Sequence, residues 1–122
     1  ANKLSQEYGN EYIFNKTIYI MAQNKIYLGQ YEDAKKELLI CLQFFKENLH
    51  NKTSLGKNYE MYYVYSLMSL IDCNIKLEQF EENKALLKEA FGYINKNKLD
   101  QYIPYFMFFK QFLFLLMLVI CN

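Results

Sequence analysis

The sequence has little of what interrupts helices or reads nucleic acid. One proline and four glycines occur in 122 residues, which favours long helices over a β-rich fold. Every basic residue is lysine, and a lysine ammonium lacks the flat bidentate fork of arginine. The net charge is only +1, so no strong field attracts a polyanion. We therefore expect no direct contact between this chain and nucleic acid.

Patterns typical of catalysis and metal binding are also missing from the sequence. The three cysteines are far apart, and the single histidine, His50, lies in a polar stretch with no nucleophile or metal-ligand partner at a useful spacing. No glycine-rich phosphate loop occurs, and neighbouring acids such as Glu81 and Glu82 point apart on a helix. These observations predict a protein that is not an enzyme and needs no metal or cofactor. Unpaired cysteines suit a reducing compartment, so we expect a cytoplasmic protein.

Apolar residues are abundant and periodic. They make up 52% of the sequence, enough for one core, and they recur at spacings of three and four. This period predicts an all-α domain spanning 1–122, with helices over about 9–28, 31–48, 59–77, 80–95 and 102–121. The expected core stripes of the first two helices are Phe14, Ile18, Met21, Ala22 and Leu28, then Tyr31, Ala34, Leu38, Cys41 and Phe45.

The sequence contains an internal repeat, in which 19–42 aligns with 68–91 without a gap. Six positions are identical, and Tyr31 corresponds to Phe80, so we expect both rings to be buried at equivalent helix corners. Gly29 is expected to end the first helix in a left-handed cap. A single helical hairpin cannot cover both of its faces, so hairpins should stack. The predicted fold is a short α-solenoid with repeats over about 9–48 and 58–97 and a terminal apolar helix over about 102–121.

The corner "LGQYEDA" resembles that of a tetratricopeptide repeat. Gly29, Tyr31 and Ala34 match its glycine, aromatic and alanine, and Ala22 matches the small residue seven positions earlier. The second copy keeps Phe80 but has Glu78 and Asn83 in place of glycine and alanine, and the spacing of 49 residues exceeds the usual 34 or so. Long, loose repeats in a lysine- and tyrosine-rich chain are similar to the peptide-sensing domains of Gram-positive regulators of the Rgg, PlcR and Rap type.

That resemblance implies a non-enzymatic module that binds a short peptide or a partner protein, as the sensor part of a bacterial transcriptional regulator. It places the ligand on a concave face lined by the first helix of each hairpin. The matching positions are Lys16, Tyr19, Gln23, Tyr27, Tyr65, Met68, Asp72 and Lys76. Asn24 and Asn74 take such a role if the register shifts by one residue. The alternative is helix packing for the tyrosines and solvation for the polar residues. A DNA-binding unit either lies upstream of these residues or does not exist.

The last helix is apolar on all sides, and such a helix must be covered on all sides. It is about long enough to span a bilayer, but Lys110 and Gln111 lie in its middle, where a lysine costs roughly 3 kcal/mol. We therefore favour a two-fold homodimer over a membrane segment, with Lys110 at the rim. The predicted interface residues are Phe112, Phe114, Leu115, Leu118 and Ile120. The alternative functions are a structural or assembly domain that dimerises through this helix, and a membrane-tethered repeat protein.

Overall fold

The computed structural model describes the backbone of residues 2–51 and 56–121 and the side chains of 9–51 and 56–120. Its elements, in chain order, are α1 (Asn2–Tyr27), α2 (Tyr31–Glu47), α3 (Gly56–Lys76), α4 (Phe80–Asn97), the 3-10 helix η1 (Asp100–Tyr102) and α5 (Ile103–Cys121). No strand occurs in these described ranges, so the all-α prediction is confirmed. The first helix starts earlier than the apolar period predicted.

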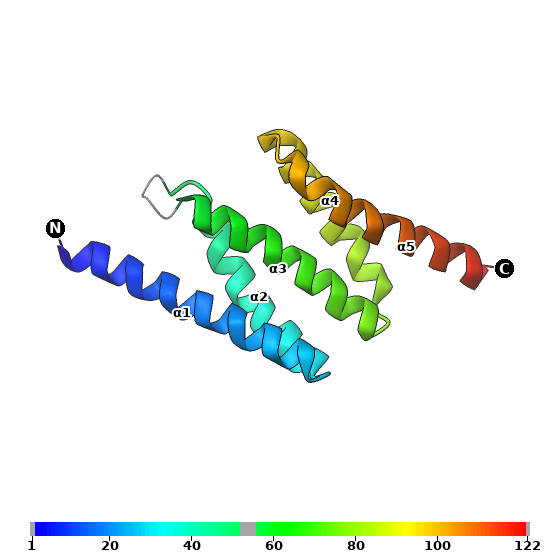
Figure 1. The fold of residues 1–122 in the computed structure, drawn as a ribbon, viewed down its shortest axis with the longest axis horizontal. Helices are drawn as coiled ribbons and strands as arrows, with labels where there is room; N and C mark the ends of the chain where they lie inside the picture. Colours follow the sequence, from blue (N-terminus) through cyan, green and yellow to red (C-terminus); the bar gives the residue numbers. More distant parts are fainter. Residues whose placement is uncertain (1, 52–55, 122) are drawn as a thin grey trace.

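The helices form two layers. Helices α1, α3 and α5 run in the same direction on one side, and α2 and α4 return on the other (Figure 1). Each helix packs on the one that follows it, and α3 also contacts α1 and α5. We call the layer of α1, α3, η1 and α5 the first layer. This layer brings together α1 and α3, which were predicted to be the first helices of the two hairpins, and the terminal helix α5.

The helix corners share one hydrogen-bond pattern. Gly29 has φ of +81°, and its backbone N–H donates to Ile26 while that of Gln30 donates to Lys25. Forty-nine residues later, Glu78 and Gln79 donate in the same way to Ile75 and Asn74. This pair of bonds is the Schellman motif, which satisfies the last carbonyl groups of a helix. The expected left-handed cap at Gly29 is therefore confirmed.

The core lies between the two layers, and its stripe on α2 is the predicted one. Ala34, Leu38, Cys41 and Phe45 are buried there, together with Leu42. Helix α3 contributes the most to the other side of this core. Its buried apolar residues are Tyr59, Tyr63, Val64, Leu67, Leu70, Ile71 and Cys73.

Three predictions about apolar positions were wrong. Phe14, Met21 and Leu28 were expected in the core of α1, but they are 64%, 47% and 67% exposed. The helix instead turns Tyr12 and Asn15 inward, whereas Ala22 is buried as predicted. Its apolar residues are spread around the helix, so the period alone did not fix which side faces the core.

The aromatic residues at the two corners are less covered than predicted. Tyr31 and Phe80 are both half-buried. Each is the first residue of its helix, and a side chain at a helix end has neighbours on fewer sides than one in the middle. Leu28 at the first corner is exposed, whereas Leu77 at the second is half-buried.

A buried amide pair replaces the small residue of the second corner. Asn83 stands where the first repeat has Ala34, and it is 2% exposed. Its Nδ2 donates to the carbonyl oxygen of Ile71 at 3.2 Å, and its Oδ1 accepts from Nδ2 of Asn74 at 3.0 Å. Asn74 is thus a core residue, which rules it out as a contact for a bound peptide. Asn24, the other alternative position, is exposed.

Candidate functional site

Four tyrosines form a continuous row across the first layer. The rings of Tyr19 and Tyr62 have centroids 5.3 Å apart, those of Tyr62 and Tyr65 are 6.4 Å apart, and those of Tyr65 and Tyr102 are 6.3 Å apart. All three contacts are edge-to-face, the arrangement that aromatic quadrupoles favour. We call these four residues the tyrosine row. Each ring is half-buried, so the row is held by the core and still reaches solvent.

Polar groups lie beside the row where α1 meets α3. Gln23 Nε2 donates to Ser69 Oγ at 2.7 Å. Burial raises the pKa of the Tyr19 phenol, and a hydrogen bond from Ser69 partly offsets that rise. Tyr19, Gln23 and Ser69 therefore form one polar cluster between the two helices. The side-chain carbonyl of Gln23 is still able to accept a hydrogen bond from a ligand.

The predicted binding residues lie on the first layer, with different degrees of cover. Lys16, Tyr19 and Gln23 on α1 are half-buried, as are Tyr65, Met68 and Asp72 on α3. Lys76 is exposed, and Tyr27 is 91% exposed at the last position of α1. The structure joins Tyr19 to Tyr65 through Tyr62 and joins Gln23 to Ser69. It gives Tyr27 no comparable support.

Sequence reasoning missed Tyr62, Ser69 and Tyr102. Tyr62 and Ser69 lie three residues before and four after Tyr65, so the helical period places them on the same side of α3. That spacing was available in the sequence. Tyr102 had no such signal, because it belongs to the short helix η1, whose position depends on how α5 packs.

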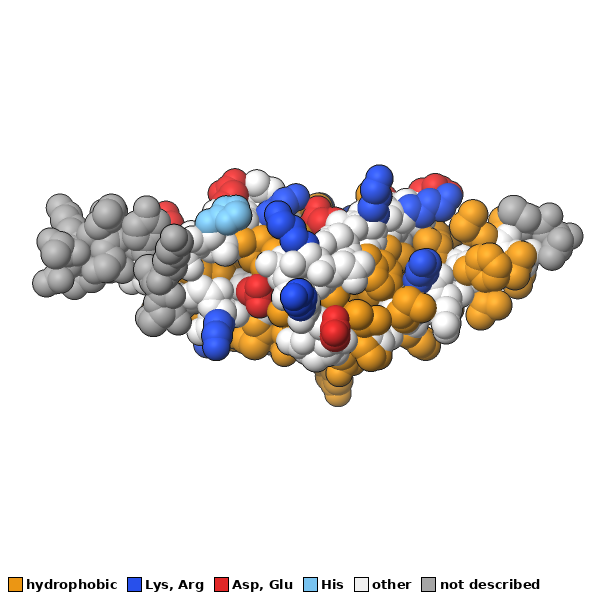
Figure 2. Space-filling view, turned by 90° about the horizontal axis from the view of Figure 1, so that it is seen from above, with side chains coloured by type: hydrophobic (Ala, Val, Ile, Leu, Met, Phe, Trp, Pro, Cys, Tyr) orange, Lys and Arg blue, Asp and Glu red, His pale blue; other side chains and the backbone are white. Residues whose placement is uncertain are grey.

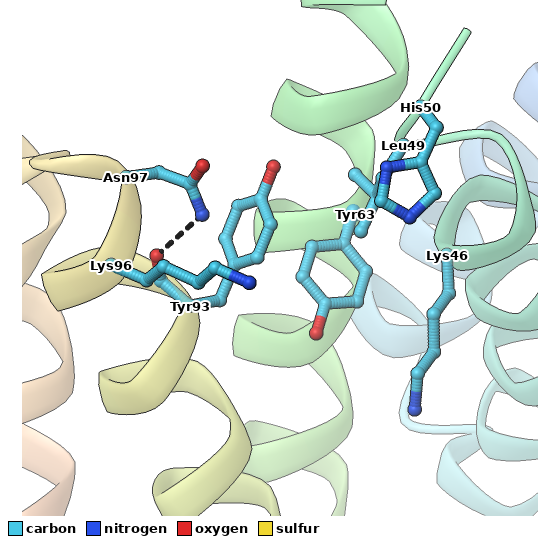
Figure 3. A pocket seen from close by; sticks show the side chains of 7 residues that line it. All are labelled: Lys46, Leu49, His50, Tyr63, Tyr93, Lys96 and Asn97. Atoms are coloured by element: carbon cyan, nitrogen blue, oxygen red, sulfur yellow. Dashed lines mark hydrogen bonds between the residues drawn. The ribbon is translucent and has the colours of Figure 1, made fainter.

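A cleft of about 520 Å³ opens on another part of the molecule, among α2, α3 and α4 (Figure 3). The close-up shows the rings of Tyr63 and Tyr93 next to each other, with Lys96 on one side and His50 and Lys46 on the other. The two ring centroids are 5.0 Å apart. Asn97 and Leu49 complete the lining. None of the predicted binding residues lines this cleft.

The polar groups of the cleft are largely paired within the chain. The Tyr63 hydroxyl donates to Glu89 at 2.8 Å, and the Tyr93 hydroxyl donates to Glu60 at 2.7 Å. Lys46 Nζ lies 3.1 Å from the same Glu89 carboxylate. Burial, and then the neighbouring carboxylates, raise the pKa values of both tyrosines, so their hydroxyls stay protonated as donors. The two tyrosine bonds join α3 to α4 within the second hairpin, and the Lys46 ion pair joins α2 of the first hairpin to α4, which gives the cleft a structural role.

Helix α5 packs on α4 and α3 but leaves much of its surface uncovered. Phe106 and Leu113 are buried, and Phe109 and Leu116 are half-buried. Nine apolar side chains between Tyr105 and Ile120 are 37% to 73% exposed. Of the predicted interface residues, Phe112 is half-buried and the other four are exposed. Figure 2 shows hydrophobic side chains gathered toward the end of the molecule where the chain terminates.

A shallow groove separates α4 from α5. Leu87, Phe91 and Leu113 line it together with Lys84, Lys88 and Lys110. The Lys110 ammonium lies 5.6 Å from the centroid of the Phe91 ring, a cation–π contact. Lys110 therefore bends back toward α4.

Within the part of the chain that the structure describes, the segment Asp100–Ile120 is long and apolar enough to cross a bilayer by length and composition, and an 18-residue stretch within it has a mean hydropathy of 2.0. Among the described residues, no three His, Cys, Asp or Glu side chains lie close enough together to hold a metal ion. Comparison of the chain with protein-family models, with curated proteins and with solved structures gives no match. The resemblance to tetratricopeptide-type sensor domains therefore remains a prediction.

Proposed function

We propose that this chain is a non-enzymatic helical-repeat module that binds a short peptide or an extended segment of a partner protein on its first layer. The observation that carries the proposal is the tyrosine row, which links α1, α3 and η1 by direct ring contacts. Tyrosine offers a large apolar surface with only two flexible side-chain angles, so little freedom is lost when a ligand lies against it. Rings already held in place reduce that loss further.

The residues beside the row suit a peptide backbone. Gln23 and Asp72, on adjacent helices, offer oxygen acceptors for peptide N–H groups, and both are half-buried. Lys16 and Lys76 add positive charge on the same layer. This composition favours a ligand with apolar side chains that lie on the rings and a carboxyl group or acidic residue toward a lysine.

Calorimetric titration of the 122-residue chain with a panel of short hydrophobic peptides tests the proposal. At least one peptide should bind, and Tyr65→Ala should weaken its binding by roughly tenfold, as loss of an aromatic anchor does. Tyr31→Ala is the matched control, because Tyr31 is half-buried like Tyr65 but lies on α2, outside the first layer. Equal affinity of the wild type and a Tyr19→Ala/Tyr65→Ala double variant, with the fold checked by circular dichroism, would reject the site.

We further propose that the module is the cytoplasmic sensor part of a bacterial regulator, a role supported only by the resemblance of its repeats. The test is the coding sequence that flanks these residues. A helix-turn-helix unit immediately upstream supports the regulator. Flanking membrane segments would instead support a tethered repeat protein.

A second candidate function is assembly through α5. The specific observation that favours it is the exposed apolar surface of that helix. Soluble monomers seldom keep a continuous apolar patch of this size open to water. Both functions can coexist in one chain, since the tyrosine row and the outer side of α5 use different residues.

A further inference from the structure

The exposed side of α5 carries a regular stripe. Pro104, Phe108, Gln111, Leu115 and Leu118 follow one another at spacings of four, three, four and three, and all five are exposed. This alternation places them along one line of the helix, as in the seam of a helix pair. The opposite side of α5 holds Phe106 and Leu113 against the rest of the chain. The stripe therefore faces away from the core.

We propose that two copies of this chain pair through α5 in antiparallel orientation, with Gln111 of each copy meeting at a two-fold axis. The area is close to what such a pair needs. Six of the nine exposed apolar side chains of α5 lie on the half of the helix that carries the stripe, and they leave roughly 700 Å² open, compared with about 800 Å² per partner in a standard interface. These six are Met107, Phe108, Phe114, Leu115, Leu118 and Val119. Covering that surface is the driving force for the pairing.

The charge of this face selects a second copy over a charged partner. Lys110 is the only charged residue in α5, and its ammonium lies over Phe91 on α4 instead of on the stripe. The stripe itself carries no charge, so a partner chosen by charge complementarity gains nothing there. A second, equally apolar copy of the same face fits it.

Gln111 sets the register of the pair, and the helix dipoles set its direction, because antiparallel packing places the positive end of each α5 beside the negative end of the other. An isolated amide in the middle of an apolar interface would lose its hydrogen bonds to water, at a cost of about 1–3 kcal/mol. A primary amide is both donor and acceptor, so two Gln111 side chains related by a two-fold axis satisfy each other. In an antiparallel pair centred on Gln111, Pro104 of one copy lies beside Leu118 of the second copy. A register shifted along the helix would place the amide against Phe108 or Leu115.

Disulfide trapping tests both the pairing and its centre. We would introduce Gln111→Cys into the full chain in a Cys121→Ser background. Two cysteines at the axis should form a dimer-linking disulfide under mild oxidation. Leu118→Cys in the same background is the matched control, because in an antiparallel pair the two copies of position 118 lie at opposite ends of the interface. The native Cys41 and Cys73 are buried, so they should stay out of the reaction.

Sedimentation velocity of the wild-type chain at micromolar concentration should show a dimer, and Leu115→Glu should shift it to monomer with an unchanged circular dichroism spectrum. A wild-type monomer overturns the proposal. Cross-linking of Leu118→Cys as complete as that of Gln111→Cys overturns the antiparallel register. Recovery of the protein only with detergent or lipid vesicles overturns the pairing in favour of a membrane-bound α5. Each of these outcomes leaves peptide binding by the tyrosine row to be decided by its own titration.

Discussion

Gly29 and Glu78 hold the same left-handed backbone conformation at equivalent corners, with φ of +81° and +58°, although only one of them is glycine. The two corners also share their hydrogen bonds, so the geometry of the repeat is kept where its glycine is lost. A left-handed residue with a Cβ costs roughly 1–2 kcal/mol relative to the right-handed conformation. The second corner therefore stores strain that the first does not have.

Glu78→Gly should stabilise the protein by about 1 kcal/mol, because glycine reaches positive φ without a steric cost. Gly29→Ala should destabilise it by a similar amount, even though open space surrounds the position where the Cβ would lie. Urea unfolding followed by circular dichroism measures both changes.

Gly92→Ala is the control for that pair of variants. Gly92 lies inside α4, is exposed, and has no atom near the position of an added Cβ. Alanine should therefore stabilise the helix by about 0.5–1 kcal/mol. Glycine to alanine should therefore lower the free energy of unfolding at Gly29 and raise it at Gly92. A change of the same sign at both positions would contradict the assigned role of Gly29.

The Asn74–Asn83 pair should be coupled in stability. Asn83→Ala restores the residue type of the first corner but removes both hydrogen bonds of Asn83, including the one that it accepts from the fully buried Asn74. Leaving a buried amide without partners costs about 1–3 kcal/mol. Asn74→Leu combined with Asn83→Ala should recover part of that loss.

A double-mutant cycle on the two asparagines measures this coupling. If the effects of the two single substitutions on the free energy of unfolding simply add up in the double variant, the two amides act independently. Asn97→Ala serves as a control in α4, because Asn97 is exposed and its side chain bonds only to the backbone one turn earlier.

Phe45 and Phe14 were both predicted to lie in the core from the helical period, but their replacement by alanine should change the free energy of unfolding by very different amounts. Phe45 is fully buried, so Phe45→Ala should cost about 3–5 kcal/mol in the free energy of unfolding. Phe14 is 64% exposed, so Phe14→Ala should change stability by less than about 0.5 kcal/mol. Thermal and urea unfolding of both variants compares them directly. A comparable loss in both would place Phe14 in a core or an interface.

The buried thiols should be unreactive at pH 8. Burial raises the pKa of Cys73 to about 11 and also raises that of Cys41, so little thiolate forms in the folded protein. A thiol reagent should modify both residues slowly in buffer and rapidly in denaturant. Fast modification of a Cys121→Ser variant under native conditions would contradict this burial.

The same shift predicts a loss of stability at alkaline pH. Between about pH 9 and the pKa of about 11 for Cys73, the unfolded chain gives up the thiol proton while the folded chain keeps it. The free energy of unfolding should therefore fall as pH rises through this range. Cys73→Ala should reduce the slope, since it removes one of the groups that cause it.

The residues of the candidate site could be predicted from the sequence where they lie on one side of the same helix, but not where they come from different helices. The resemblance pointed to Tyr65, Met68 and Asp72, and their spacing of three and four residues places them on one side of α3. The contact of Tyr19 with Tyr62 joins two helices separated by all of α2, and no local pattern specifies it. Resemblance supplied Tyr19, and the helical spacing of α3 offered Tyr62, but only the packing supplied Tyr102 and the contact between Tyr19 and Tyr62.

The sequence by itself determined the five helices and the glycine cap at the first corner. These features depend on local rules: a period of three to four residues, scarce proline, and a residue able to take positive φ. The stripe of α2 also followed from its sequence, because its charged residues mark the side that faces water.

Only the tertiary structure decided which side of α1 and α5 is buried. Both helices carry apolar residues on most sides, so their sequences permit several orientations of nearly equal hydrophobic gain. The choice came from the neighbours: Tyr12 of α1 packs edge-on against Tyr59 of α3, and Phe106 of α5 packs against Phe91 of α4. The left-handed backbone conformation of Glu78 also depends on the tertiary structure, because the stacked helices hold a corner conformation that glutamate does not favour on its own.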